Sequence, residues 1–142
     1  MPDALVFVLK EADALIAYAP LSDEQEFASF LQENNISKSG ISVLADRESD
    51  PTSFANLLTK RFLGKRIALL IPGREFDASG TRHGRGGGWY DRFLSKVPRD
   101  WVRVGILKSA QFSEKPLTRE AWDEPMDWLL IQDGSEWKAL KI

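Results

Sequence analysis

A run of five consecutive apolar residues, IALLI at Ile67 to Ile71, constrains the fold of this chain more than any other segment. No polar residue interrupts the run, so a strand at this position could expose neither face to water. Strands of that kind are typical of parallel sheets that helices cover on both faces. The pair Pro72-Gly73 then ends the run. The segment therefore predicts a central strand of an α/β sheet.

Two other segments carry the start signals of amphipathic helices, and a third has an apolar helical face that ends before Pro98. Ser22 has Gln25 three residues later, which is the spacing of a capping box. Asp50 is followed by Pro51, which is the pattern of an N-cap with proline at the first helical position. We expect helices over residues 22–34, 50–63 and 89–97.

Short apolar runs predict the remaining strands. Run length alone leaves a buried helix open for the first two of these runs. The runs are 4–9, 14–19, 41–45, 66–71, 102–108 and 126–131, with a terminal edge strand at 136–142. Because strands alternate with helices, we predict one three-layer α/β domain over residues 1–142, with a mainly parallel sheet and helices on both faces.

Composition excludes several classes of function. The 142 residues contain no cysteine and one histidine, His83, so disulfides, thiolate catalysis and two-histidine metal motifs are ruled out. The formal net charge of -2 argues against a nucleic-acid partner. No apolar run is long enough to cross a membrane, and the start of the chain lacks the pattern of a signal peptide. We therefore expect a cytoplasmic protein that binds neither nucleic acids nor membranes. We also expect the side chain of His83 to point at its loop or at solvent.

The segment GTRHGRGGGWYDRFL, residues 80–94, combines glycines with arginines between a predicted strand and a predicted helix. Backbone amides of glycines at the start of a helix can approach an anion closely, and guanidinium groups can bind phosphate oxygens in pairs. A Walker loop does not fit, because Gly64-Lys65 is followed by arginine, and a solvated surface turn is the alternative. The candidate phosphate-binding residues are Arg82, Gly84, Arg85, Gly86, Gly87 and Gly88.

The longer segment IPGREFDASGTRHGRGGGWYDRFL resembles the signature of the 5-formyltetrahydrofolate cyclo-ligase family. LSDEQEF resembles the acidic substrate segment of that family, and VGILKSAQF with EAWDEPMD resembles two later segments. The resemblance implies the cyclo-ligase fold, which is NagB/RpiA-like. It also implies an enzyme that uses ATP and magnesium to convert 5-formyltetrahydrofolate into 5,10-methenyltetrahydrofolate. Such phosphoryl transfer depends mainly on positioning and charge neutralisation.

The resemblance also implies roles for individual residues. Arg82 through Tyr90 would line the ATP phosphates, with Arg85 and Tyr90 as catalytic residues. Arg85 would also face the folate. Trp89 and Glu24 would contact the folate substrate. The two magnesium ligands would be Asp91 and Asp123.

Each of these assignments has a structural alternative. A carboxylate such as Asp91 is favoured in the first turn of a helix without any metal, and Asp123 could stabilise a turn. Glu26 lies two positions from Glu24, so the register of the acidic segment is open. Two aromatic residues could instead belong to the hydrophobic core, namely Trp89 and Tyr90.

The chain departs from the family pattern at its start. Family enzymes begin with a basic helix that reaches the ATP phosphates, whereas this chain begins MPDALVFVLKEADAL, with Lys10 the only basic residue before Lys38. Two hypotheses follow from the match and the departure. The first is a short cyclo-ligase, as a homo-oligomer in which a second subunit supplies basic residues. The second is a phosphate-binding or nucleotide-binding module of the same fold, without catalysis or with a different specificity.

Overall fold

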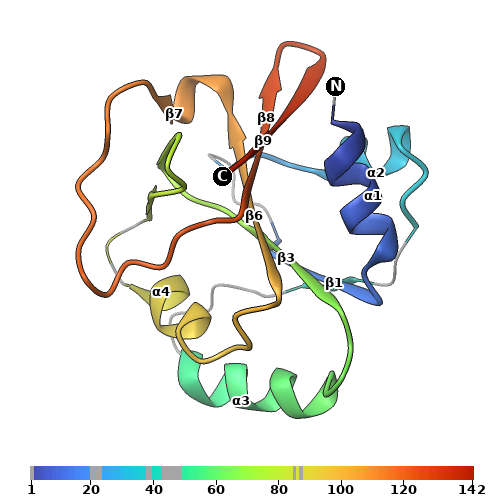
Figure 1. The fold of residues 1–142 in the computed structure, drawn as a ribbon, viewed down its shortest axis with the longest axis vertical. Coiled ribbons are helices and arrows are strands. Elements are labelled where there is room, and N and C mark those ends of the chain that lie inside the picture. Colours follow the sequence, from blue (N-terminus) through green and yellow to red (C-terminus); the bar gives the residue numbers. More distant parts are fainter. Residues whose placement is uncertain (1, 20–23, 38–39, 43–48, 85, 87) are drawn as a thin grey trace.

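The computed structural model describes residues 2–19, 24–37, 40–42, 49–84, 86 and 88–142, with the backbone alone for 40–42. Its main feature is a six-stranded sheet with the order β2-β1-β3-β6-β8-β9 (Figure 1). All neighbouring strands are parallel except β8 and β9, which form an antiparallel hairpin. The strands are β1 (Ala14–Ala17), β2 (Gly40–Ser42), β3 (Ile67–Ile71), β6 (Val102–Lys108), β8 (Trp128–Asp133) and β9 (Glu136–Lys141). The predicted mainly parallel sheet is confirmed.

The strand order creates one preferred place for a ligand. The chain adds β2 on one side of β1 and then returns to add β3 on the other side. The connections that leave the carboxyl ends of β1 and β3 therefore diverge, and ligands of open α/β sheets bind at such a switch point. Here the two strands end at Ala17 and Ile71, immediately before Tyr18 and the Pro72-Gly73 pair.

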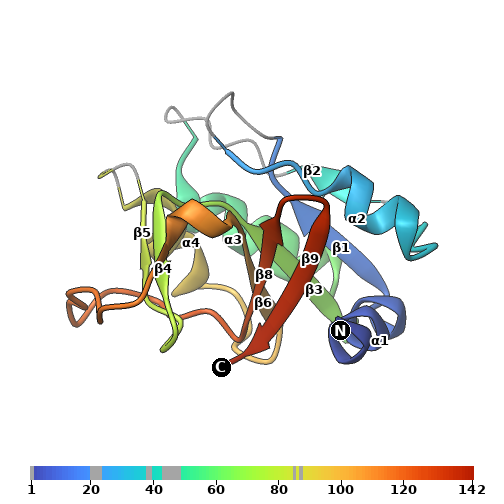
Figure 2. The same cartoon turned by 90° about the horizontal axis from the view of Figure 1, so that it is seen from above.

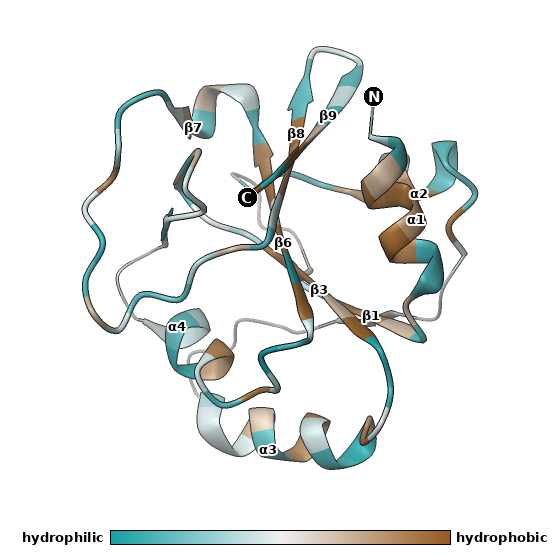
Figure 3. Cartoon of the chain, viewed as in Figure 1, coloured by the Kyte–Doolittle hydropathy of each residue, from teal (hydrophilic) through white to brown (hydrophobic). Residues whose placement is uncertain are grey.

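Helices cover both faces of the sheet, as Figure 2 shows from above. The helices are α1 (Asp3–Glu11), α2 (Ala28–Glu33), α3 (Pro51–Arg61) and α4 (Trp89–Leu94). Side chains of α1 and α2 pack with Ala68 and Leu70 of β3, whereas those of α3 and α4 pack with Ile67, Leu69 and Ile71. Every residue of β3 is buried, and the apolar colouring of the central strands is visible in Figure 3. The three-layer prediction is confirmed.

Helix α3 begins where the sequence predicts. The Asp50 side chain accepts a hydrogen bond from the Ser53 backbone N–H at 3.2 Å, and Pro51 occupies the first helical position. Ala55 and Leu58 carry the buried face. Leu57, which precedes buried Leu58 in the sequence, is instead 62% exposed. The helix start therefore follows from local chemistry, whereas the width of the apolar face does not.

The strand predicted over residues 4–9 is wrong, and the helix predicted over 22–34 is shorter than expected. Residues 4–9 belong to helix α1, in which Leu5 and Leu9 lie one turn apart and are buried while Phe7 is 64% exposed. Residues 20–23, including the predicted cap Ser22, lie outside the described residues. Helix α2 begins only at Ala28. The Gln25 side chain does not cap a helix but donates to Gln132 Oε1 at 2.6 Å.

A second, three-stranded sheet carries the glycine-rich segment and was not predicted. Its strands are β4 (Glu75–Asp77), β5 (Arg82–His83) and β7 (Phe112–Ser113) in the order β5-β4-β7, and the 3-10 helix η1 (Ser109–Gln111) precedes β7. Gln111 Nε2 donates to the Gly73 carbonyl at 3.0 Å and thereby connects η1 to the end of β3. Strands of two or three residues show too little alternation to be recognised from sequence.

Buried Asp77 anchors this small sheet. Its carboxylate accepts hydrogen bonds from the Leu117 N–H at 2.7 Å, the Ser79 hydroxyl at 2.8 Å, and the N–H groups of Ser79 and Thr81 at 3.0 Å. Burial acts to raise the pKa of Asp77, but these hydrogen bonds outweigh it and hold the pKa below its ordinary value. The carboxylate therefore stabilises the fold above the pKa of an unfolded aspartate, about 3.9, and this contribution disappears as pH falls through the lower folded pKa.

Asp77→Asn is expected to lower the free energy of unfolding at pH 7 by about 1 to 3 kcal/mol, since a charged acceptor of four hydrogen bonds becomes neutral. The same substitution should make stability less sensitive to acid, because the group no longer titrates. Urea unfolding of both proteins at pH 7 and pH 3 measures this. An equal loss of stability between the two pH values in both proteins would show that Asp77 does not carry the acid sensitivity.

Within the described part of the chain, no helix is both long and apolar enough to cross a membrane. The strand predicted over residues 41–45 is described only as far as Ser42. The predicted strand over 126–131 begins two residues later, at Trp128. The single-domain organisation and the cytoplasmic location stay predictions.

Candidate active site

Arg82 lies at the centre of the candidate site, next to the carboxyl end of β3. Its side chain is buried, with the residue 7% exposed, and its Nε donates to the Pro72 carbonyl. The guanidinium carbon lies 4.8 Å from the centre of the Tyr90 ring, which is within cation–π range. Burial lowers the pKa of Arg82, and the charges of Asp91, Glu24 and Asp123 oppose that change. The Tyr90 ring thus lies beside this guanidinium group, and the charges of three other predicted site residues act on it. The group stays protonated at any physiological pH.

Two glycines make room for this arginine. A Cβ atom on Gly84 would lie 2.9 Å from Arg82 Nη2, closer than real Cβ atoms approach. A Cβ on Gly73 would lie 3.1 Å from Arg82 Cγ and 2.9 Å from the Phe76 ring. The small size of Gly84 is therefore explained by packing against Arg82. Its predicted contact with ATP stays a prediction.

The rest of the glycine cluster leads into α4. Gly86 and Gly88 have φ angles of 96° and 68°, which residues with a Cβ rarely adopt, and Gly88 caps α4. Apart from its two chain neighbours, no described residue has an atom within 4 Å of a Cβ built on Gly86. Arg85 and Gly87 lie outside the described residues, so their predicted roles rest on the sequence.

Trp89 belongs to the hydrophobic core. It is 8% exposed, and its ring stacks on Phe93 with the ring centres 5.3 Å apart. Its indole N–H donates to the Ser49 carbonyl at 3.1 Å. The core alternative therefore accounts for Trp89, and its predicted contact with ATP and folate stays a prediction.

Tyr90 is buried as well, but its hydroxyl differs from the Trp89 indole. Among the described residues, no group forms a hydrogen bond with this hydroxyl. Burial raises the pKa of Tyr90, against the opposing effect of Arg82, so the group stays a neutral donor. A buried hydroxyl without a partner costs free energy, which an oxygen atom of a bound ligand would recover.

Asp91 and Asp123 come together although they lie on different segments. Asp91 is half-buried on α4, and its Oδ1 accepts a hydrogen bond from the Glu124 N–H at 3.1 Å. Burial raises the pKa of Asp91, and the neighbouring charge of Asp123 raises it further. Asp123 Oδ2 accepts from the Glu120 N–H at 2.8 Å, so it also stabilises a turn as the alternative proposed.

The pair fits a magnesium site of the nucleotide-dependent kind. No group of three or more histidine, cysteine, aspartate or glutamate side chains in the described ranges is arranged to hold a metal. Magnesium is often bound by only one or two carboxylates together with substrate phosphates and water. Asp91 and Asp123, which repel one another as anions, supply such a donor set. The residues present therefore suit this cation.

The two glutamates of the acidic segment face different neighbours. Glu26 accepts hydrogen bonds from the Ser29 N–H at 3.2 Å and the Ser29 hydroxyl at 2.7 Å, at the start of α2. The charge of Glu24 instead acts on Arg82 and Tyr90. The contacts with Ser29 account for Glu26 without a ligand, and the predicted folate contact of Glu24 stays a prediction.

Sequence reasoning missed Tyr18, which follows the end of β1 at the switch point. Tyr18 is 2% exposed, and its hydroxyl donates to the Gln25 carbonyl. Burial raises the pKa of Tyr18, and the charges of Glu24 and Tyr90 raise it further. In the sequence it appears as one more apolar residue of the run ALIAYA, although its place after a parallel strand could have marked it.

His83 contributes to the frame of the site. Its Nε2 lies 2.6 Å from the Thr118 carbonyl oxygen. Arg119 Nε donates to the Thr81 hydroxyl at 2.9 Å, and Arg119 Nη2 donates to the Ser79 carbonyl at 2.8 Å. These contacts of Thr118 and Arg119 connect the segment that leads to Asp123 to the small sheet. The His83 side chain thus faces this segment, while the residue itself belongs to strand β5.

The fold and site define a ligand-binding α/β protein with cationic, phenolic and acidic groups at a switch point, and comparisons with known proteins specify its family. The model of the 5-formyltetrahydrofolate cyclo-ligase family matches residues 57–132. A 5-formyltetrahydrofolate cyclo-ligase of Mycoplasma pneumoniae is 31% identical over 121 residues, covering 82% of this chain and 70% of that protein. One from Mycoplasma genitalium is 35% identical over 66 residues, or 46% of this chain and 38% of that protein.

A solved structure agrees with the sequence comparisons. The 5,10-methenyltetrahydrofolate synthetase from Mycoplasma pneumoniae matches with a TM-score of 0.56 and 25% sequence identity, covering 91% of this chain and 79% of that one. The chain belongs to the 5-formyltetrahydrofolate cyclo-ligase family. The resemblance drawn from the glycine-rich segment is therefore confirmed.

Proposed function

We propose that this chain is an ATP-dependent cyclo-ligase that converts 5-formyltetrahydrofolate into 5,10-methenyltetrahydrofolate, with ADP and phosphate as the other products. Membership of a cyclo-ligase family supports the reaction class. The observation that carries the proposal is the buried guanidinium of Arg82, which lies 4.8 Å from the centre of the Tyr90 ring. The charges of Asp91, Glu24 and Asp123 act on this group. Arg82 donates to the Pro72 carbonyl just after β3 ends, next to the switch point where the fold favours a ligand.

The reaction consists of two displacements. The formyl oxygen of the folate attacks the γ-phosphorus of ATP, which forms an oxygen–phosphorus bond and releases ADP. The neighbouring folate nitrogen then attacks the activated formyl carbon, loses its proton, and expels the oxygen as inorganic phosphate. The protein must therefore bind two anionic substrates and hold the formyl oxygen in line with the phosphoryl group.

The residues of the site suit these tasks. Arg82 and Arg85 would bind phosphate oxygens by charge-assisted hydrogen bonds, and the Tyr90 hydroxyl would donate to an oxygen atom of a ligand. The Glu24 carboxylate would accept hydrogen bonds from N–H groups of the folate ring, with Trp89 beside it. Magnesium held by Asp91 and Asp123 would neutralise charge on the transferred phosphoryl group.

Product formation tests this proposal. The methenyl product absorbs at longer wavelength than the substrate, so its formation can be followed directly. We expect product only when 5-formyltetrahydrofolate, ATP and magnesium are all present. A series of protein concentrations tests whether activity needs a homo-oligomer. If ATP binds but no product forms at any protein concentration, the chain is a nucleotide-binding module of this fold.

Arg85→Ala should weaken the binding of a non-hydrolysable ATP analogue by about 1.5 to 3 kcal/mol, because one charge-assisted contact is lost. Isothermal titration calorimetry measures the affinity. Arg66→Ala is a matched control, since Arg66 precedes β3 at the opposite end of the sheet and its side chain is 72% exposed. Equal affinities of the Arg85 variant and the wild type would remove the glycine-rich segment from the nucleotide site.

A further inference from the structure

A fully buried arginine lies next to the candidate active site and has no role in the proposed reaction. Arg103 is the second residue of β6, and its side chain is only 1% exposed. Burial lowers the pKa of Arg103, but a guanidinium group remains charged in proteins. A buried charge is costly unless good partners surround it, and apolar residues of similar volume often stabilise a fold equally well. The partners of Arg103 therefore suggest what it does.

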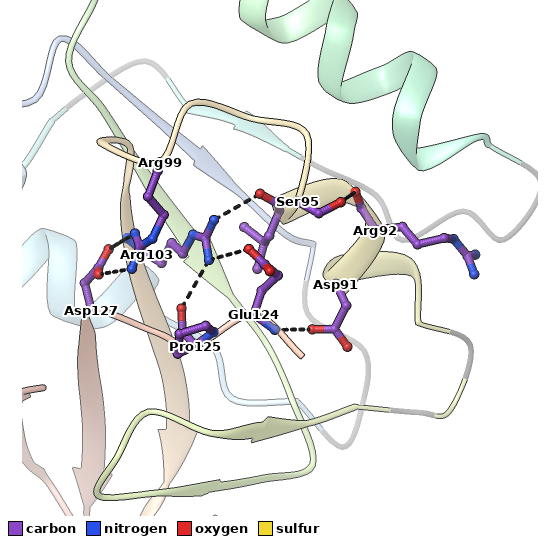
Figure 4. Close-up of polar contacts among 9 residues, drawn as sticks. Asp91, Arg92, Ser95, Arg99, Arg103, Glu124, Pro125 and Asp127 are labelled. Atoms are coloured by element: carbon purple, nitrogen blue, oxygen red, sulfur yellow. Dashed lines mark hydrogen bonds and ion pairs between the residues drawn. The ribbon is translucent and has the colours of Figure 1, made fainter. Parts of the chain in front are cut away.

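Those partners come from two segments that carry candidate metal ligands. Nη1 forms a 3.0 Å ion pair with Glu124 Oε1 and donates to the Pro125 carbonyl at 3.4 Å. Nη2 donates to the carbonyl of Leu94, the last residue of α4, at 3.0 Å. Nε has no hydrogen-bond partner among the described residues. Figure 4 shows this guanidinium between the end of α4 and the segment that contains Glu124.

Glu124 links Arg103 to the acidic pair. While its side chain is held by Arg103, its backbone N–H donates to Asp91 Oδ1 at 3.1 Å. Asp123 is the residue immediately before it. A shift of Glu124 would therefore move Asp123 and break the hydrogen bond that orients Asp91. The contacts of Arg103 with Glu124 and of Glu124 with Asp91 therefore form one connected chain that ends at the acidic pair.

We propose that Arg103 is a positioning residue, which through Glu124 holds Asp123 beside Asp91 so that both carboxylates bind one divalent cation of the nucleotide complex. This inference rests on the proposed function, because that function supplies the metal–nucleotide ligand. Lysine at this position would preserve the charge but not the two-armed contact with Glu124 and Leu94. The orientation of the pair, and not charge alone, is what Arg103 provides.

The test measures Mn²⁺ binding in the presence of a non-hydrolysable ATP analogue, by electron paramagnetic resonance of free Mn²⁺. Arg103→Met should weaken Mn²⁺ binding by about 10- to 100-fold, the range found when outer partners of metal ligands are removed. The Mn²⁺ affinity of Arg103→Lys should fall between that of Arg103→Met and that of the wild type. Arg99→Met is the matched control, because Arg99 pairs with Asp127 of the same segment at 2.9 Å but its side chain is 56% exposed. It should change Mn²⁺ binding less than about twofold.

Two further measurements separate positioning from a structural role. Urea unfolding reports the stability of each variant, and the dependence of product formation on magnesium reports the cation site. Arg103→Met should raise the half-saturating magnesium concentration, with most of kcat recovered at high magnesium. If Arg103→Met does not fold, Glu124→Gln weakens the same ion pair at nearly equal volume and should shift Mn²⁺ binding in the same direction.

The outcomes are distinct. A variant with lower stability but wild-type Mn²⁺ affinity would show that Arg103 is structural only, and would overturn the inference. A wild type that binds no Mn²⁺ with the analogue would overturn it as well. If the wild type and variants differ in Mn²⁺ affinity as expected but none forms product, the positioning role holds and the proposed function fails.

Discussion

Asp91→Asn and Asp123→Asn are each expected to slow the formation of 5,10-methenyltetrahydrofolate by about 100-fold or more. Each substitution removes one negative charge from the proposed cation site, where stabilisation of the transition state is worth several kcal/mol and each 1.4 kcal/mol corresponds to about a tenfold change in rate. Asparagine retains an oxygen that can accept the Glu124 N–H, so the contact that orients Asp91 at 3.1 Å can persist. Steady-state rates at saturating ATP, folate and magnesium measure the effect.

Asp133→Asn provides the control for these variants. Asp133 ends β8, and its 3.6 Å pair with Lys138 is more than half exposed on both sides. Such pairs contribute at most about 1 kcal/mol, so this variant should keep nearly wild-type rates. Full activity in both the Asp91 and Asp123 variants would show that the two carboxylates do not hold a required cation.

Phe76→Ala is expected to lower the free energy of unfolding by about 3 to 5 kcal/mol, the range for removal of a buried phenylalanine ring. Phe76 is fully buried, and its ring fills the space above two glycines. A Cβ on Gly105 of β6 would lie 2.6 Å from this ring, and a Cβ on Gly73 would lie 2.9 Å from it. The ring therefore joins the small sheet to the main sheet, and its loss leaves a cavity beneath the glycine-rich segment.

Urea unfolding compares Phe76→Ala with Leu57→Ala, a truncation at an apolar residue of α3 that is 62% exposed. The exposed truncation should change stability by no more than about 0.5 kcal/mol. Similar losses in the two variants would contradict the packing described for Phe76. Weak nucleotide binding by a still-folded Phe76→Ala protein would show that the small sheet supports the site.

The elements that could be predicted are those that local chemistry determines. Ile67 to Ile71 is apolar throughout, and the structure buries every residue of this strand. Helix α3 starts at Pro51, and the Asp50 side chain before it accepts a hydrogen bond from the backbone N–H of Ser53. The sequence does not decide the structure of residues 4–9, because a short apolar run fits a buried strand and a buried helix equally well. Contacts distant in sequence decided between them, since Leu5 and Leu9 pack with residues of β3 in one apolar cluster.

The candidate site likewise has features that a local motif predicts and features that depend on contacts distant in sequence. The glycines and Arg82 lie in one segment, so their motif is visible in the sequence. The contact between Asp91 and Glu124 joins residues 33 positions apart, and no local pattern predicts it. Arg103 alternates with valines in VRVGILK as a solvent-facing residue of an edge strand would, yet it is buried. Tertiary pairing with Glu124 explains that burial.

The fate of the formyl oxygen tests the central claim most directly. 5-Formyltetrahydrofolate labelled with ¹⁸O in the formyl group is incubated with the protein, ATP and magnesium, and the released inorganic phosphate is analysed by mass spectrometry. Phosphoryl transfer to the formyl oxygen, followed by ring closure, predicts that each phosphate released with a methenyl product carries one ¹⁸O atom. Phosphate without the label, or cleavage of ATP that is independent of folate, would contradict the assignment of this chain as a cyclo-ligase.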